Sequence, residues 1–289
     1  MPDTTARIYD VRYQRYEGAT RTRPSAVWSF ARSGWLRALG IRRAATAKIW
    51  PFLLVTLAFA PVIVAVSIPA FAKGLNGGKA PTELMSYAQY LNVLAMVVVV
   101  FVASTIPMLL TKDRRDRVLS LYFSTSMSRL EYVVGRALSS LWLVLMVTLL
   151  PMLLLFLGSV LVVDHPGTYF RHHVGVLPRV LLAGLLVAVY QAAVGMAVGA
   201  MTARRVFAVG TYLALMLVSS VLGGILAGTT KHDNFLVVSL FLTPYNLVDR
   251  VLDDEVAYTP WLSGVAYAAV VLLCAGVVAV RYARKGGQE

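Results

Sequence analysis

Three histidines and one aspartate lie within ten residues, in the segment DHPGTYFRHH that runs from Asp164 to His173. Imidazole and carboxylate groups are common metal ligands, so this segment is the first candidate for a metal centre. Its spacing matches none of the standard zinc patterns, in which pairs of ligands recur at fixed intervals. We therefore expect no metal site in this chain.

A glycine-rich segment, GLNGGKA at residues 74–80, has some features of a phosphate-binding loop. That loop needs four residues between its first glycine and its Gly-Lys pair, and a hydroxyl residue directly after the lysine. Here three residues separate Gly74 from Gly78, and Ala80 follows Lys79. The pattern predicts no nucleotide site, no cofactor and no catalytic residue, so we expect the chain not to be an enzyme.

The composition is typical of a protein that is solvated by lipid. Apolar residues make up 58% of the chain, its mean hydropathy is +0.70, and only 14% of its residues are charged, against about 25% in soluble domains. Six stretches of 23 to 27 residues contain no Asp, Glu, Lys, Arg or His, and each is long enough to cross a bilayer as a helix. They are residues 50–72, 86–111, 137–163, 180–203, 206–230 and 256–280.

These uncharged stretches also exclude several classes of membrane protein. Intramembrane proteases need a carboxylate pair or a polar nucleophile inside the bilayer, and ion-coupled carriers usually keep ionisable groups there. The spans of this chain contain no acidic residue and no histidine, so any active transport needs an external source of energy. The single cysteine, Cys274, excludes an internal disulfide.

The basic residues predict the orientation in the membrane. Six spans put both termini on one side, together with residues 112–136 and the pair Arg204 and Arg205, and this side holds 21 of the 27 Lys and Arg residues. By the positive-inside rule it faces the cytoplasm, which for a bacterial protein means the cytoplasmic membrane. The net charge of +13 is then a topology signal, and we expect no nucleic-acid partner.

Two segments outside the spans have their own pattern. Residues 25–43 place Val27, Trp28, Ala31, Trp35, Ala38 and Leu39 on one side of a helical wheel, which predicts a helix lying in the headgroup plane. Residues 234–248 are apolar but too short to cross, so we expect a partly re-entrant outer segment, broken at Thr243-Pro244. The predicted organisation is a cytoplasmic arm at 1–49, a transmembrane domain at 50–282 and a tail at 283–289.

The segment from Lys112 to Arg136 is the longest predicted cytoplasmic loop between spans. Leu119, Tyr122 and Phe123 fall at helical spacing within it, and charges bracket them on both sides. A short amphipathic helix here would present an apolar and aromatic surface to a soluble partner. The alternative is a solvated loop whose charges only set the topology.

TKDRRDRVLSLYFSTSMSRLEYVVGR resembles the coupling region of ABC-2 type permeases, the membrane subunits of ATP-driven exporters. Asp113 to Arg117 match the family's charged start, Ser128-Arg129 its turn, and Gly135-Arg136 its Gly-Lys pair. Ser126 or Met127 stands where proline is usual, and Arg136 replaces lysine. The six spans, the cytoplasmic termini, the interfacial helix and the re-entrant outer segment agree with that family.

The resemblance implies an all-α integral membrane protein with two kinds of partner: a second copy or a homologous permease, and two cytoplasmic ABC ATPases that carry ATP and Mg²⁺. The expected docking residues are Arg115, Asp116, Arg117, Leu119, Leu121, Tyr122, Phe123, Arg129 and Glu131. A substrate path between two subunits would be lined by spans two and five. The polar residues there are Gln89, Asn92, Ser104, Thr105, Thr211, Tyr212, Ser219 and Ser220.

Each of these polar side chains could instead serve helix–helix hydrogen bonding. Two other functions also stay open from the sequence. One is a carrier that works alone, against which the lack of charge inside the spans argues. The other is a membrane scaffold or sensor that uses the same loop to recruit a cytoplasmic ATPase without transporting anything.

Overall fold

The computed structural model describes residues 22–41, 45–75, 85–116, 118, 122, 127–163 and 165–284. Four predicted docking residues, Arg117, Leu119, Leu121 and Phe123, lie outside this described part, as do the first 21 residues. The glycine-rich segment from residue 76 onward and Asp164 lie outside it too.

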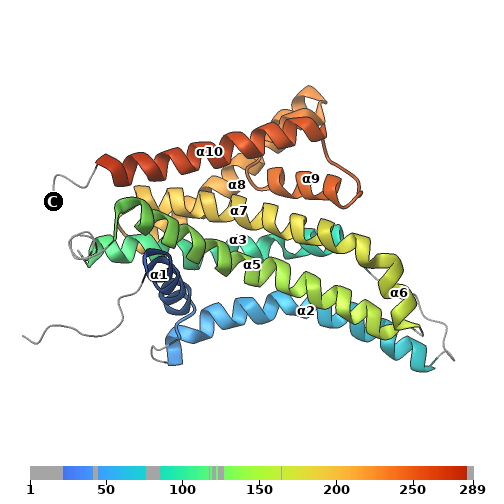
Figure 1. The fold of residues 1–289 in the computed structure, drawn as a ribbon. Helices are drawn as coiled ribbons and strands as arrows, with labels where there is room; N and C mark the ends of the chain where they lie inside the picture. Colours follow the sequence, from blue (N-terminus) through green and yellow to red (C-terminus); the bar gives the residue numbers. More distant parts are fainter. Residues whose placement is uncertain are drawn as a thin grey trace, which may run out of the picture.

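The described residues form helices and contain no strand, as the sequence predicts (Figure 1). Six helical segments, α2, α3, α5, α6–α7, α8 and α10, are long and apolar enough to span a membrane, so the predicted number of spans is confirmed. The elements are α1 (Arg23–Ala38), α2 (Ala45–Leu75), α3 (Tyr87–Arg115), α5 (Arg129–Val162), α6 (Pro166–His173), η1 (Val174–Val176), α7 (Leu177–Met201), α8 (Arg205–Thr230), η2 (Asp233–Val238), α9 (Leu242–Val251) and α10 (Pro260–Arg284).

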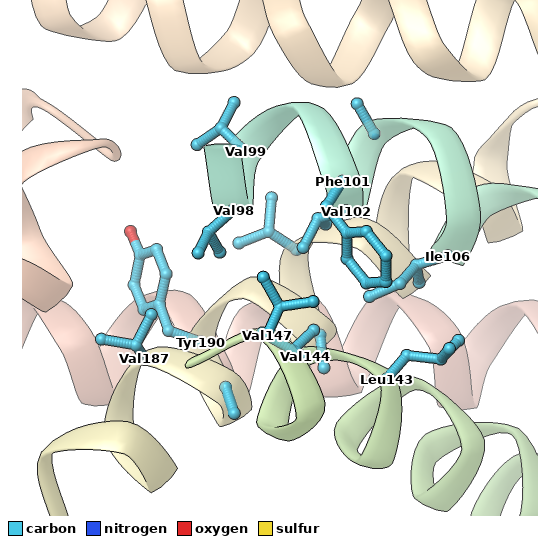
Figure 2. Close-up of a cluster of buried hydrophobic side chains, with 14 of the residues drawn as sticks. Val98, Val99, Phe101, Val102, Ile106, Leu143, Val144, Val147, Val187 and Tyr190 are labelled. Carbon is cyan, nitrogen blue, oxygen red and sulfur yellow. The ribbon is translucent and has the colours of Figure 1, made fainter. Parts of the chain in front are cut away.

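The core of the bundle is formed by α3, α5 and α7. Valine side chains from the three helices, among them Val98, Val102, Val147 and Val187, point toward one another and are completely or almost completely buried (Figure 2). Within an apolar stretch of 18 residues in each span, 67% of the residues are buried in α3 and in α6–α7, against 28% or less in α2, α8 and α10. The peripheral helices therefore expose most of their apolar surface, as lipid-facing helices do.

The helix α1 packs across α5 at the end of the bundle where α3 ends and α5 begins (Figure 1). Small residues allow this close approach. A Cβ atom added at Gly34 would come within 2.5 Å of the Ser139 Oγ atom, and one at Gly135 within 2.6 Å of the Phe30 ring. The Ser139 hydroxyl is 2.8 Å from the carbonyl oxygen of Ala31 and also 2.8 Å from that of Gly135, so it links the two helices.

The buried face of α1 differs from the face that the helical wheel selects. Phe30 and Gly34 are buried with Ala31, although neither belongs to the predicted apolar side, while Trp28 is 56% exposed. The reason is that the buried face of α1 depends on which residues fit closely against α5, and not only on which residues are hydrophobic. The tryptophans form a second apolar face, on which Trp35 packs against Trp142 of α5 with their ring centroids 6.2 Å apart.

The outer segment between α8 and α10 folds into two short helices, η2 and α9, and α9 packs against α7 and α10 (Figure 1). Pro244 does not break a helix, because it lies in the first turn of α9, where its missing N–H group has no intrahelical partner to lose. Asn246 holds the chain that follows: its Oδ1 atom accepts hydrogen bonds from the backbone N–H groups of Ala257 and Tyr258.

Candidate functional site: the junction of α1, α3 and α5

A buried ion pair joins the two ends of the predicted coupling loop. Asp113 lies in the last turn of α3 and Arg136 in the second turn of α5, and both side chains are almost completely buried, at 2% and 1% exposure. The Arg136 guanidinium donates to the Asp113 Oδ2 atom, which also accepts from the Tyr132 hydroxyl at 2.9 Å. Burying two charges is costly unless they are paired, so this geometry requires both partners.

Aromatic rings surround this ion pair. The Arg136 guanidinium carbon lies 4.3 Å from the centroid of the Phe30 ring of α1, at a distance typical of a cation–π contact. The Tyr132 ring lies 5.5 Å from the Phe30 ring and 5.4 Å from the Tyr282 ring of α10. We call Phe30, Tyr132, Arg136 and Asp113 the junction cluster, because it brings α1, α3 and α5 together at one point.

Three predicted docking residues take defined places beside this cluster. The half-buried Tyr122 ring packs against Phe30, with centroids 5.3 Å apart and an interplanar angle of 74°. Glu131 and Ser128 form a capping box that begins α5, because each side chain accepts the other residue's backbone N–H group. Arg129, the first residue of α5, is exposed. Their docking role stays a prediction.

The other charged residues at the start of the predicted coupling loop differ in how exposed their side chains are. Arg115 is exposed, and its Nε atom lies 3.7 Å from the Asp116 carboxylate. Arg114, which the sequence groups with these surface charges, is half-buried, and its Nη1 atom donates to the carbonyl oxygen of Ala200 at 2.7 Å. It therefore binds the C-terminal end of α7, where carbonyl groups lack intrahelical partners, and is a structural residue.

The predicted path residues of α3 make hydrogen bonds within the chain. Gln89 forms the capping box of α3 with Ser86. The Asn92 amide donates to the Asp249 carboxylate of α9 at 3.3 Å. Ser104 and Thr105 donate to the carbonyl oxygen of Phe101 in their own helix. These contacts explain the four side chains structurally, and the structure does not bring them to one open surface.

The path residues of α8 hold the outer segment in place. The Ser219 hydroxyl accepts from the backbone N–H group of Leu240 at 3.1 Å, and the Ser220 and Ser239 hydroxyls lie 2.9 Å apart. Tyr212 is completely buried and donates to the Gln191 side chain. Thr211 is exposed. Ser219 thus satisfies a backbone N–H group of the segment between α8 and α9, and the other contacts join side chains.

Comparison with known protein families places this geometry in context. Residues 63–281 match the model of the ABC-2 family transporter proteins. The chain belongs to the ABC-2 family. The match begins inside α2 and ends inside α10, so it includes the coupling loop and most of the transmembrane bundle, but not α1. No curated protein matches the chain.

Family membership makes this ABC-2 protein a multi-pass membrane protein and a permease component of an ABC transporter. Permeases of this family are normally non-enzymatic membrane subunits, and they associate in general with ABC ATPases and with a second permease. The expected family, fold and transport class are therefore confirmed.

At the other end of the permease, three aspartates attach α9 and the segment that follows it to the bundle. Asp249 accepts from Asn92 of α3, Asp254 accepts from the Ser86 hydroxyl at 3.0 Å, and Asp253 pairs with Arg179 of α7. Burial raises the pKa of the Asp249 carboxyl to about 6, with the nearby Asp254 charge acting in the same direction and the Asn92 hydrogen bond opposing it. The acidic cluster thus packs across the helix ends of the bundle.

Sequence reasoning misses the buried polar groups of this permease. Asp113 and Arg136 enter the sequence analysis only as parts of a family pattern, and Gln191 does not enter it at all. One signal could have found the ion pair: opposite charges at the facing ends of two consecutive spans are placed to meet when the spans form a hairpin. No comparable signal identifies Phe30, because its role depends on how α1 crosses α5.

Proposed function

We propose that this chain is the membrane-spanning permease of an ATP-driven exporter of the bacterial cytoplasmic membrane, with both termini in the cytoplasm. Two permeases, either identical or homologous, associate in the membrane. Two separate ABC ATPases, which carry ATP and Mg²⁺, dock on residues 112–136. The substrate leaves between the permeases, and the apolar spans with scattered hydroxyls suit an amphipathic drug, peptide or lipid.

The junction cluster is the observation that carries this proposal. A loop that receives force from an ATPase can move the spans only if it is firmly connected to them. The Asp113–Arg136 pair connects both ends of the loop to each other, and Phe30 connects α1 to the same point. Movement of the docked loop would thus be transmitted to α1, α3 and α5 together.

The experiment co-expresses the permease with an ABC ATPase from the same genome and measures the retained ATPase and its hydrolysis rate in lipid. Tyr122→Ala should reduce retention by about tenfold or more, because truncating a packed interface aromatic commonly costs about 2 kcal/mol. Tyr122→Phe keeps the ring that packs on Phe30 and should retain the ATPase. Arg32→Ala, an exposed change on α1, is the matched control.

Three outcomes would argue against the proposal. Normal retention and normal turnover by Tyr122→Ala would make the segment a topology loop. ATP hydrolysis by the purified permease alone would contradict its non-enzymatic role. If the ATPase is retained but vesicles move no substrate under any condition, the alternative of a membrane scaffold or sensor would be favoured.

A further inference from the structure

A cleft of about 440 Å³ lies between α1 and the end of α3, beside the junction cluster. Its volume falls within the range of small-molecule sites, about 300–1,000 Å³. Two cationic side chains line it, Arg37 of α1 and Lys112 of α3, and Leu36, Ile41 and Val118 add an apolar wall. We call this the α1 cleft. Asp116 and Tyr122 of the proposed docking segment also line the cleft, but the proposed mechanism assigns no ligand to the space itself.

The charges around the α1 cleft favour an anion. Asp113 lines the cleft, but the buried Arg136 already compensates its charge through the Oδ2 atom. The Arg37 Nη1 atom lies 3.8 Å from the Asp113 Oδ1 atom, which is a long distance for an ion pair. The Lys112 ammonium group makes no hydrogen bond or ion pair with any residue that the structure describes. Asp116 is near Arg115, at 3.7 Å. Arg136 and Arg115, which do not line the cleft, thus compensate its two carboxylates, and the lining residues Arg37 and Lys112 have spare donors.

The backbone holds the apolar wall beside these cations. The turn after α1 contains Gly40, whose φ angle of 75° is one that side-chain-bearing residues rarely adopt. This turn returns the chain so that the Ile41 N–H group bonds to the Leu36 carbonyl oxygen at 3.0 Å, as in a Schellman motif. Leu36 and Ile41 are thereby kept together on the cleft wall.

The tryptophans of α1 favour a position of the cleft near the lipid headgroups. Trp28 is 56% exposed on α1, and Trp35 packs on Trp142 two residues before Arg37. Tryptophan side chains concentrate at the boundary between headgroups and acyl chains. A ligand in the cleft would therefore meet cations at the headgroup level and apolar side chains next to them, which suits a molecule with a phosphate and an acyl chain.

We propose that the α1 cleft binds the phosphate headgroup of an acidic phospholipid from the cytoplasmic leaflet, with Arg37 and Lys112 as the phosphate ligands. The shared recognition chemistry is a phosphate ester, and the apolar wall favours the lipid over a soluble phosphate. The inference rests on the proposed orientation of the permease but not on ATPase docking. Its consequence is that lipid composition acts on α1 next to the coupling loop.

The test uses the full-length permease alone, purified in a neutral detergent and titrated with three probes. Native mass spectrometry measures binding of dioleoyl phosphatidylglycerol, dioleoyl phosphatidylcholine and soluble glycerol 3-phosphate. We expect tight binding of phosphatidylglycerol, and at least about tenfold weaker binding for Arg37→Gln and for Lys112→Gln, since each removes a charged hydrogen bond. Arg32→Gln, an exposed arginine of the same helix outside the cleft, should bind as the wild type does.

Unfolding temperatures in lipid-free detergent show whether a variant binds poorly because it is misfolded. Lys112→Gln provides the safeguard, because Lys112 has no partner to lose in the described structure. Equal binding of phosphatidylglycerol and phosphatidylcholine would overturn the proposal. Equal binding of glycerol 3-phosphate would also overturn it, in favour of a soluble phosphate site. If both variants bind lipid normally but lose the ATPase, the cleft is instead part of the protein interface.

Discussion

Removing the charge of Arg136 should destabilise the permease far more than removing both members of its ion pair. Arg136→Met leaves the Asp113 carboxylate buried at 2% exposure without its main cation. Breaking a buried pair commonly costs about 3–5 kcal/mol. We expect about 3 kcal/mol, the lower end, because the Tyr132 hydroxyl still donates to Asp113 and Arg37 lies within 3.8 Å.

The partner variants make the reasoning quantitative. Asp113→Asn leaves the Arg136 guanidinium buried without a carboxylate, so we expect a similar loss of about 3 kcal/mol. The double variant contains no buried charge and should lose only about 1–2 kcal/mol, because two uncharged groups of similar volume avoid the desolvation cost. Arg136→Lys keeps the charge but loses the planar contact with Phe30, which is worth about 1 kcal/mol.

The assay is equilibrium unfolding in mixed detergent micelles, followed by tryptophan fluorescence. The double-mutant cycle gives a coupling energy, which these expected losses put at about 4 kcal/mol or more in favour of the pair. If the two single losses simply add in the double variant, Asp113 and Arg136 do not interact energetically. The junction cluster would then not be the connection on which the proposed coupling depends.

Three further predictions follow from other parts of the structure. Gly34→Ala should destabilise the permease by about 1–3 kcal/mol through overpacking, whereas Gly210→Ala, where a Cβ meets no atom within 4 Å, should cost nothing in thermal unfolding. The pKa of Asp249 is about 6 in the folded protein and near 3.8 in the unfolded chain. Raising the pH from 5 to 7.5 should therefore lower the free energy of unfolding by about 1 kcal/mol, and Asp249→Asn should abolish this pH dependence. In a cysteine-free background, an impermeant thiol reagent applied to intact cells should label a cysteine at Gly167 and not one at Ser126, and the reverse pattern would refute the orientation.

Much of the architecture could be predicted from one-dimensional patterns. Each span is a long uncharged stretch, and lipid forces such a stretch into a helix because its backbone groups have no other partner. This signal is local, so no tertiary information is needed to recognise it. The helix ends are predicted less well: the sequence places a loop at 112–136, whereas α3 continues to Arg115 and α5 begins at Arg129, where Ser128 and Glu131 form a capping box.

The sites depend on contacts that no local pattern contains. Phe30 and Gly34 are buried although the predicted apolar side of α1 does not include them. Where two helices cross, a residue is buried because its size allows close packing, and not only because it is hydrophobic. Arg114 looks like a surface charge in the sequence, and only the position of the α7 C-terminus makes it a structural ligand. The α1 cleft likewise exists only because Arg37 and Lys112, far apart in the chain, are brought together where α1 meets α3. Hydrophobic length thus determines that the chain spans the membrane, and the packing of its helices decides which charges meet.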